Sequence, residues 1–273
     1  MDAIPPLPPE IWDRTPPVAQ EMILAQAAAL AQQRAWRWTA VTSWVTVFVV
    51  RRSRGGKVAQ ELLGERFWGY LGTARWSAYP WDPTWRRQLC CAHLRRDSAA
   101  MIERGGQAQV LGKAWRGQAL QMVQGWHRVR DGRLAQTTFA RYLWPIRREV
   151  ERWLEAGQTC GVPKPERRCR KIRKVRQALW TFVRHTGGEP TNNAAARAIR
   201  PGVLWRIGSF GTQRADGSRF VEALMTVGAT RNQQHRDVLD SLTAACEAAL
   251  RGEGAPSLLP TPAHLTQGMR PAP

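Results

Sequence analysis

The sequence predicts a mixed α/β fold with a long helical region in its middle. Alternating β-branched residues between 36 and 52 are typical of one or two strands. Val58 and Leu62 lie four residues apart and indicate a short helix over 56–66. The stretch from 107 to 185 is basic and helical in character. Strands interleaved with helices favour a mixed sheet with helices packed against it.

The N-terminal part is unusual at the point where it joins the first predicted strand. Residues 1–16 are rich in proline, and residues 18–34 have good helix propensity. This helix runs into strand-like sequence after Arg34 with no turn signal between them. Such an abrupt change from helical to strand-like sequence is unusual.

Two more strands and a helix are expected before the basic region, over 67–73, 88–94 and 96–103. Cys91 and His93 would then lie on one face of a strand. A metal pair is one interpretation, but a packed core pair is favoured because no further Cys or His lies nearby.

The C-terminal part predicts a helix over 191–200, capped by Thr191 or Asn192, and a last long helix over 236–251. Arg206 would follow the first of these in a strand or turn.

The charge points to a polyanionic partner. The 273 residues include 41 Lys and Arg against 21 Asp and Glu, which gives a net charge of +20. Most of the basic residues are arginine, whose planar guanidinium binds phosphate in bidentate fashion. Neutralising phosphates releases counterions, so nucleic acid is the favoured partner, and an acidic scaffold is excluded. The alternative is an arginine-rich composition on an ordinary basic protein.

A cytoplasmic location is expected. The most apolar run, 39–50, contains several Thr and Ser residues. It is also shorter than the roughly 20 apolar residues that a membrane span needs. The N-terminus carries acidic residues and prolines where a signal peptide would be basic and then apolar. The five cysteines form no CxxC pair, so neither a zinc ribbon nor a disulfide framework is indicated.

Several motifs occur in one characteristic order. They are RWSAYPW (75–81), RRQLCCAHLRRD (86–97), ALWTF (178–182), EPTNNAAARAIRP (189–201), LWRIGSFGTQ (204–213), GSRFVE (217–222) and APSLLP (255–260). Together they resemble the bacterial transposases of the insertion-sequence-66 family, from PPEIW (8–12) through Pro260.

The resemblance implies a ribonuclease-H-like mixed sheet with a helical insertion and an Asp-Asp-Glu active site that binds two Mg²⁺ ions. Mg²⁺ prefers oxygen ligands, and two ions roughly 3.5–4 Å apart stabilise both the attacking and the leaving oxygen of a phosphodiester.

This chain departs from the family at each carboxylate. The second aspartate corresponds to Ala74 and the glutamate to Ala196. The first aspartate belongs to a segment ahead of the strand that resembles AWRWTAV (35–41), and that segment is absent here. The Arg34 junction therefore resembles an internal deletion that also removed the first strand, the zinc-binding module and a DNA-binding segment.

The expected organisation follows from this resemblance. It comprises a Pro-rich N-terminus with a remnant helix (1–34), the first part of the core (35–104), a basic helical insertion (105–177), the C-terminal part of the core (178–252) and a Pro-rich tail (253–273). A sheet without its first strand exposes an edge, where pairing with another molecule or aggregation is expected.

The functional expectation is a transposase-family remnant that retains DNA binding, lacks catalytic residues and metal ligands, and needs no cofactor. One alternative is a DNA-binding competitor of intact transposase. Another is an active enzyme that uses other carboxylates, for which the candidates are Asp82, Asp97, Glu189 and Glu222. Asp97 is better explained as a helix cap or ion-pair partner, and Glu222 as a helix residue near Arg219.

Expected partners are DNA and, as further options, intact transposase or a second copy of the chain, with no membrane. The location would be the bacterial cytoplasm in association with the nucleoid. The basic run over 166–176 is the best candidate for phosphate contact. The DNA-binding candidates are Arg75, Arg95, Arg96, Arg167, Arg168, Arg170, Lys171, Arg173, Lys174, Asn192, Asn193, Arg197, Arg200 and Arg206.

Tryptophan is abundant, with 14 residues. Most of them are expected to be apolar core residues. The core candidates are Trp36, Trp38, Trp44 and Trp180, while base stacking is the minority interpretation for Trp81, Trp85 and Trp205.

Overall fold

The computed structural model describes residues 35–64, 66–74, 78–209, 211–212 and 214–260. The helix predicted over 18–34 and the tail beyond residue 260 lie outside the described residues, as does Arg75. The chain divides into two compact units, and each is described by itself. The first comprises residues up to Arg54 together with residues from Ala198 onward, and the second comprises Gly55–Arg197.

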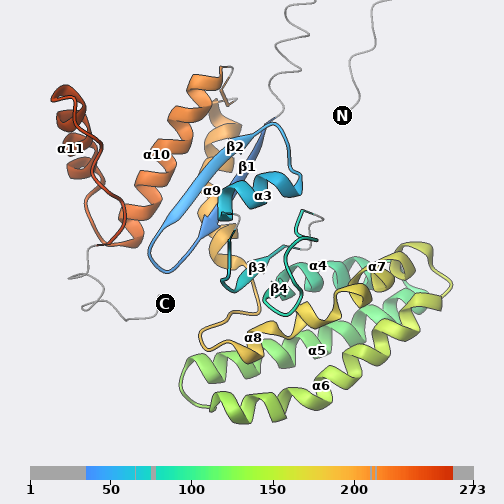
Figure 1. Cartoon of the computed structure of the whole chain (residues 1–273). Helices are drawn as coiled ribbons and strands as arrows, with labels where there is room; N and C mark the ends of the chain where they lie inside the picture. The colour runs from blue at the N-terminus through green and yellow to red at the C-terminus, as the bar shows by residue number, and fades with distance from the viewer. Residues whose placement is uncertain (1–34, 65, 75–77, 210, 213, 261–273) are drawn as a thin grey trace, which may run out of the picture. The chain divides into compact units, whose positions relative to one another are not determined.

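An antiparallel hairpin opens the first unit (Figure 1). Its strands are β1 (Trp36–Val41) and β2 (Thr46–Arg51), which confirms the strands predicted between 36 and 52. The Thr42 hydroxyl closes the turn, because its Oγ1 accepts hydrogen bonds from the backbone N–H of Trp44 at 3.2 Å and of Val45 at 2.9 Å.

Three helices complete this unit: α9 (Asn193–Ser209), which begins in the other unit, α10 (Ala215–Gln233) and α11 (Val238–Leu250). The last one confirms the helix predicted over 236–251. It is capped by Asp237, whose side chain accepts from the N–H of Leu239 at 2.6 Å and of Asp240 at 3.1 Å.

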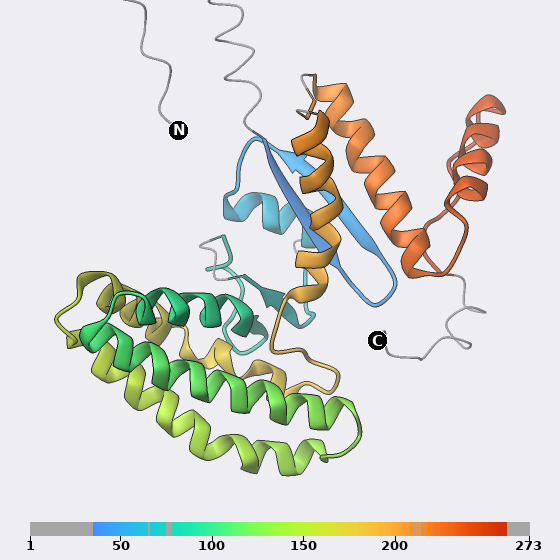
Figure 2. The same cartoon turned by 180° about the vertical axis from the view of Figure 1, so that it is seen from behind.

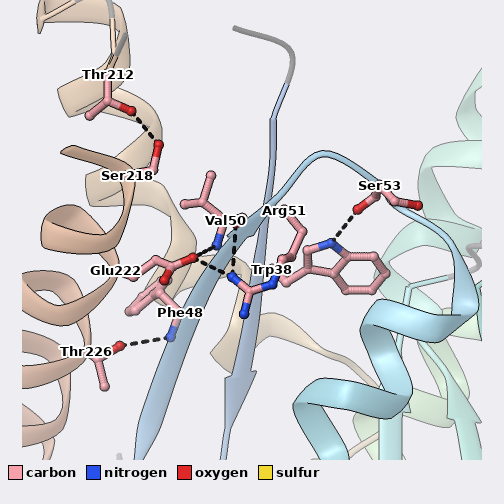
Figure 3. Close-up of polar contacts among 9 residues, drawn as sticks. All are labelled: Trp38, Phe48, Val50, Arg51, Ser53, Thr212, Ser218, Glu222 and Thr226. Carbon is pink, nitrogen blue, oxygen red and sulfur yellow. Dashed lines mark hydrogen bonds and ion pairs between the residues drawn. The ribbon is translucent and has the colours of Figure 1, made fainter. Parts of the chain in front are cut away.

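Helix α10 lies along the outer edge of β2 and supplies hydrogen-bond acceptors to it (Figure 3). The three pairs are Thr46 N to Thr230 Oγ1 at 3.2 Å, Phe48 N to Thr226 Oγ1 at 3.0 Å, and Val50 N to Glu222 Oε1. Every second strand residue meets every fourth helix residue, because four helical steps rise about 6 Å and two strand steps about 6.6 Å. One edge of the hairpin is thereby protected by side chains instead of by another strand.

Helix α9 is longer than the sequence predicted. It continues through Pro201 to Ser209, so the expectation that Arg206 follows in a strand or turn is wrong. A proline inside a helix removes one backbone hydrogen bond and crowds the carbonyl four residues earlier, so the continuation of α9 runs against local propensity. Gly202 is buried, and a Cβ atom there would collide with the side chains of Arg37 and Met225, so α9 approaches β1 and α10 closely at this glycine.

The second unit combines a short parallel strand pair with a helical body, whose helices run from teal to yellow in Figures 1 and 2. The strands β3 (Leu71–Thr73) and β4 (Arg87–Leu89) pair in parallel. The helical elements are α3 (Gly56–Leu63), α4 (Cys91–Ile102), α5 (Gly106–Arg130), α6 (Gln136–Ala156), η1 (Gly157–Thr159), α7 (Pro163–Lys174), η2 (Arg176–Leu179) and α8 (Thr181–Arg184).

Several boundaries in this unit differ from the predictions. The strand expected over 88–94 ends at Leu89, and α4 begins at Cys91. Cys91 and His93 therefore lie on a helix and not on one face of a strand. The cause is a long-range contact, since the Cys91 N–H donates to the Pro190 carbonyl at 2.8 Å instead of extending the ladder. The strand expected over 67–73 is likewise reduced to β3.

The main hydrophobic core lies in the second unit, between α4, α5, α6, α7 and α8. Its buried residues include Leu94, Phe139, Leu154, Ile172 and Phe182. Periodic apolar residues of the amphipathic helices α6 and α7 face this core, which confirms the helical character expected for the middle of the chain. The mixed α/β class is thus confirmed. No helix within the described ranges is long and apolar enough to cross a membrane.

The tryptophans predicted for the core are divided. Trp38 and Trp180 are buried, as expected. Trp44 is half-buried. Trp36 is 45% exposed and lies under the guanidinium of Arg54, 4.4 Å from its ring, so its core assignment is wrong. A residue at the first position of a strand has fewer neighbours than one at its centre.

Candidate active-site edge and nucleic-acid interface

Three segments of the second unit meet at the carboxyl ends of β3 and β4. The carbonyl of Thr73, at the end of β3, accepts from the N–H of Cys90 at 2.9 Å. The Cys91 N–H is bound to Pro190 O, and the Asn192 N–H donates to the Cys90 Sγ atom at 3.3 Å. These bonds join the two strand ends to the loop that leads into α9. The carboxyl edge of parallel strands is where α/β folds commonly bind ligands.

Both alanines that the sequence predicts at family carboxylate positions lie in segments that flank this edge. Ala74 directly follows the last residue of β3. Ala196 lies in the first turn of α9, where its N–H donates to the Asn192 carbonyl at 3.1 Å. Methyl side chains offer no oxygen to a metal. In the part of the chain that the structure describes, no group of three or more His, Cys, Asp or Glu side chains could hold a metal ion.

Two of the alternative carboxylates form ion pairs in the same unit. Asp82 is buried and lies 2.6 Å from the Arg86 guanidinium. Asp97 lies 2.9 Å from Arg168, which confirms the ion-pair interpretation. Because α4 begins at Cys91, Asp97 lies inside the helix, and the cap interpretation is wrong.

The other two candidates also lie in structural settings. Glu222 belongs to the first unit, where its Oε1 accepts from Val50 N and from the Arg51 guanidinium at 2.8 Å (Figure 3). Glu222 is helical, as expected, and it forms an ion pair with Arg51. The side chain of Glu189 is half-buried, and its backbone carbonyl accepts from the Tyr70 hydroxyl at 2.7 Å.

The basic run over 166–176 forms most of helix α7, which is amphipathic. Its buried face consists of Pro165, Cys169 and Ile172. The exposed basic residues are Arg167, Arg170, Lys171, Arg173 and Lys174, while Arg168 is half-buried. Arg170 pairs with Glu166 at 3.0 Å and Arg173 with Glu155 at 3.4 Å. Helix α7 thus has a cationic outer face opposite its apolar one.

Comparison with known families identifies the family of this chain. A model of the transposase IS66 family matches residues 23–219, which is well over half of the chain. The chain belongs to the IS66 family of transposases. No curated protein and no solved structure matches it.

The remaining DNA-binding candidates of this IS66-family chain lie on α4 and on or directly before α9. Arg95 and Arg96 are exposed on α4. The next residue, Asp97, forms the ion pair with Arg168 of α7. The candidates associated with α9 are Asn192, half-buried just before the helix, and the exposed Asn193, Arg197, Arg200 and Arg206. The side-chain Oδ1 of Asn192 is buried and has no hydrogen-bond partner among the described residues.

Three buried cysteines of the second unit, Cys90 and Cys91 beside β4 and Cys169 on α7, lie in packed surroundings. Cys90 and Cys91 are buried, and burial raises the pKa of the Cys91 thiol far above its ordinary value. Burial also raises the pKa of Cys169, to about 11. Both thiols stay protonated at neutral pH, so neither is a nucleophile or a metal-binding thiolate there.

One feature of the family member was missed at the sequence level: an exposed aromatic group beside β3 and β4. Trp68 is 78% exposed and Trp85 is 49% exposed. The Arg86 guanidinium carbon lies 5.4 Å from the Trp68 ring centroid and 5.8 Å from that of Trp85. The stacking interpretation included Trp85 but not Trp68, although the exposed Gly69 beside it signals a turn. Of the other stacking candidates, Trp81 is half-buried and Trp205 is 39% exposed.

Proposed function

We propose that this IS66-family chain binds DNA and does not cleave or join it. The observation that carries this proposal is the pair Ala74 and Ala196 at the carboxyl edge of β3 and β4. A two-metal site needs several oxygen ligands on separate elements, and these side chains provide none. The residues present therefore do not fit a pair of Mg²⁺ ions, and no catalytic step is assigned to them.

The DNA-binding half of the proposal rests on charge. A net charge of +20 favours phosphate contacts through counterion release. The exposed face of α7 concentrates that charge on one helix, with Arg167, Lys171 and Lys174 on the side opposite Cys169.

The fold that we propose is a ribonuclease-H-like core without its first strand. The order of elements supports it: an antiparallel hairpin, a helix, and then a parallel strand pair with the helical body after it. The proposed loss of the first strand follows from the expected absence of the segment that would carry the first aspartate.

The decisive experiment mixes the purified full chain with duplex DNA that carries an element end, and with a shuffled duplex, in the presence of Mg²⁺. We expect both duplexes to be bound with steep salt dependence and neither to be nicked. Mg²⁺-dependent cleavage would overturn the proposal. A marked preference for the element end at about 0.15 M salt would favour the competitor role over a remnant without a selected role.

A variant of α7 tests where the duplex binds. The double substitution Arg167→Gln and Lys171→Gln should lower the slope of log affinity against log salt by up to about 2, at roughly 0.9 per lost phosphate contact. The control is Arg219→Gln with Arg251→Gln, which makes the same change of net charge at residues paired with Asp216 and Glu253. Equal effects of the two variants would show that α7 is not the contact surface.

A further inference from the structure

A compact aromatic group stands out on the surface of the second unit. We call Trp68, Trp85, Phe67 and the central Arg86 the aromatic platform. The Arg86 guanidinium lies within 6 Å of all three rings, with the distance to Phe67 at 5.9 Å. Isolated exposed apolar residues are ordinary, but two neighbouring tryptophans with this much free area indicate a binding surface.

The centre of the platform is fixed in place. Arg86 forms its ion pair with Asp82, whose side chain is fully buried, and the Arg86 side chain itself is only 11% exposed. Its backbone carbonyl accepts from the Leu71 N–H at 3.0 Å, which joins the loop that carries Trp68 to the residue before β4. The rings therefore surround a guanidinium that does not move freely.

The flanking loops also hold the tryptophans in position. Gly69 has no side chain, and a Cβ atom there would lie 2.8 Å from the Phe67 ring, so glycine lets this ring fold back. On the other side, the Thr181 hydroxyl lies 2.8 Å from the Arg87 carbonyl oxygen and 3.2 Å from that of Thr84, and the Arg184 guanidinium donates to the Trp85 carbonyl at 3.4 Å. The platform is thus organised before any ligand binds, which lowers the entropic cost of binding.

The chemistry of the platform fits an unpaired nucleotide. The tryptophans offer flat apolar faces. Positive charge comes from the exposed Arg66, two residues before Trp68 in the chain, and from the exposed Arg184, whose guanidinium donates to the Trp85 carbonyl. Bases stack on aromatic side chains whatever their sequence, and cationic groups hold the phosphates. The bases of an intact duplex are already stacked on one another and cannot use such a surface.

From this combination we infer that the aromatic platform is a stacking site for unpaired bases of single-stranded or locally opened DNA. The inference rests on the proposed DNA-binding function and adds the kind of DNA. The platform lies at the amino ends of β3 and β4, whereas Ala74 and Cys90 lie at their carboxyl ends. The two places are about 10 Å apart along these three-residue strands, so the platform is separate from the family's catalytic edge.

The test uses a double variant that combines Trp68→Ala and Trp85→Ala. Its affinities for fluorescent oligothymidine and for a duplex of equal length are compared with those of the unmodified chain. The variant should bind oligothymidine roughly 5- to 100-fold more weakly, because stacking is lost at one or two bases, and it should bind the duplex as before. A Trp68→Phe variant retains an aromatic face and should recover part of the affinity.

The matched control is Trp144→Ala on α6, because Trp144 is also exposed, at 60%, and also lies under an arginine, Arg148. It should leave oligothymidine binding unchanged. Provided that the unmodified chain binds duplex DNA, three results would overturn the inference. The platform variant could bind oligothymidine as before, it could lose affinity for duplex and single strand equally, or it could change only in oligomeric mass. Failure of the unmodified chain to bind either DNA would instead overturn the proposed function.

Discussion

At the scale of single residues, Glu222 shows how a carboxylate that is suspected of catalysis can have a structural task. Its Oε1 accepts from Val50 N at the edge of β2 and from the Arg51 guanidinium (Figure 3). With its side chain 16% exposed, it stabilises groups that would otherwise lose hydration without a partner. This arrangement leaves no reason to assign Glu222 to metal binding.

We therefore predict that Glu222→Ala lowers the free energy of unfolding by about 1–3 kcal/mol, because a partly buried N–H and a guanidinium lose their acceptor. Glu222→Gln keeps an acceptor oxygen and should lose less. Urea titration followed by circular dichroism measures both variants, with Glu247→Ala on the exposed side of α11 as control. A loss no larger for Glu222→Ala than for the control would contradict the prediction.

At the scale of elements, the hairpin has two different edges. The N–H groups of β2 that point away from β1 are bound by α10. In the antiparallel register the residues opposite them are Arg37, Thr39 and Val41, so the backbone N–H and C=O groups of these β1 residues point away from β2. Among the described residues, no hydrogen bond links these backbone groups to another strand. An edge of this kind is a template for pairing with a strand of another molecule.

Proline scanning of β1 tests this edge. Thr39→Pro removes an outward N–H and should convert concentration-dependent oligomers into monomers, with the hairpin retained. Ala40→Pro removes an inward N–H opposite Val47 and should destabilise the hairpin itself. Light scattering coupled to size-exclusion chromatography gives the masses. A wild-type chain that remains a monodisperse monomer at high concentration would refute the pairing.

At the scale of the whole molecule, the apolar core is unevenly distributed. The main cluster of buried residues runs from Leu89 to Phe182 and lies entirely within the second unit. In the first unit, the hairpin contributes only Trp38 and Phe48 as buried hydrophobic residues. Local stability follows the amount of buried apolar surface, so the two units should differ in their free energies of opening.

Hydrogen exchange monitored by mass spectrometry can measure this difference. Amides in the middle of α5 and α6 should exchange more slowly than amides of β1 and β2 under native conditions, because the helices enclose the main core. Uniform exchange rates across both units would instead indicate one cooperative unit and contradict this expectation.

The sequence by itself determined those properties that depend on residue identity and local pattern. Motif order identified the transposase family, and β-branched alternation located the hairpin strands. The placement of Ala74 and Ala196 at the carboxylate positions remains a prediction from the motifs. The two faces of α7 also follow from the sequence, because its apolar residues recur at helical spacing and the basic residues occupy the remaining positions.

Only the tertiary structure decided the features that depend on distant partners. At Cys91, where α4 begins, the N–H is bound by the distant Pro190 carbonyl. Helix α9 continues past Pro201, and Gly202 directly after it packs closely against Arg37. Glu222 binds the edge of β2 although it is far from it in the chain. The exposure of Trp68 and the close approach of the Phe67 ring to Gly69 were likewise not evident from the sequence. Local propensities are small, at most about 1 kcal/mol for most residues, so hydrogen bonds and packing between remote segments override them.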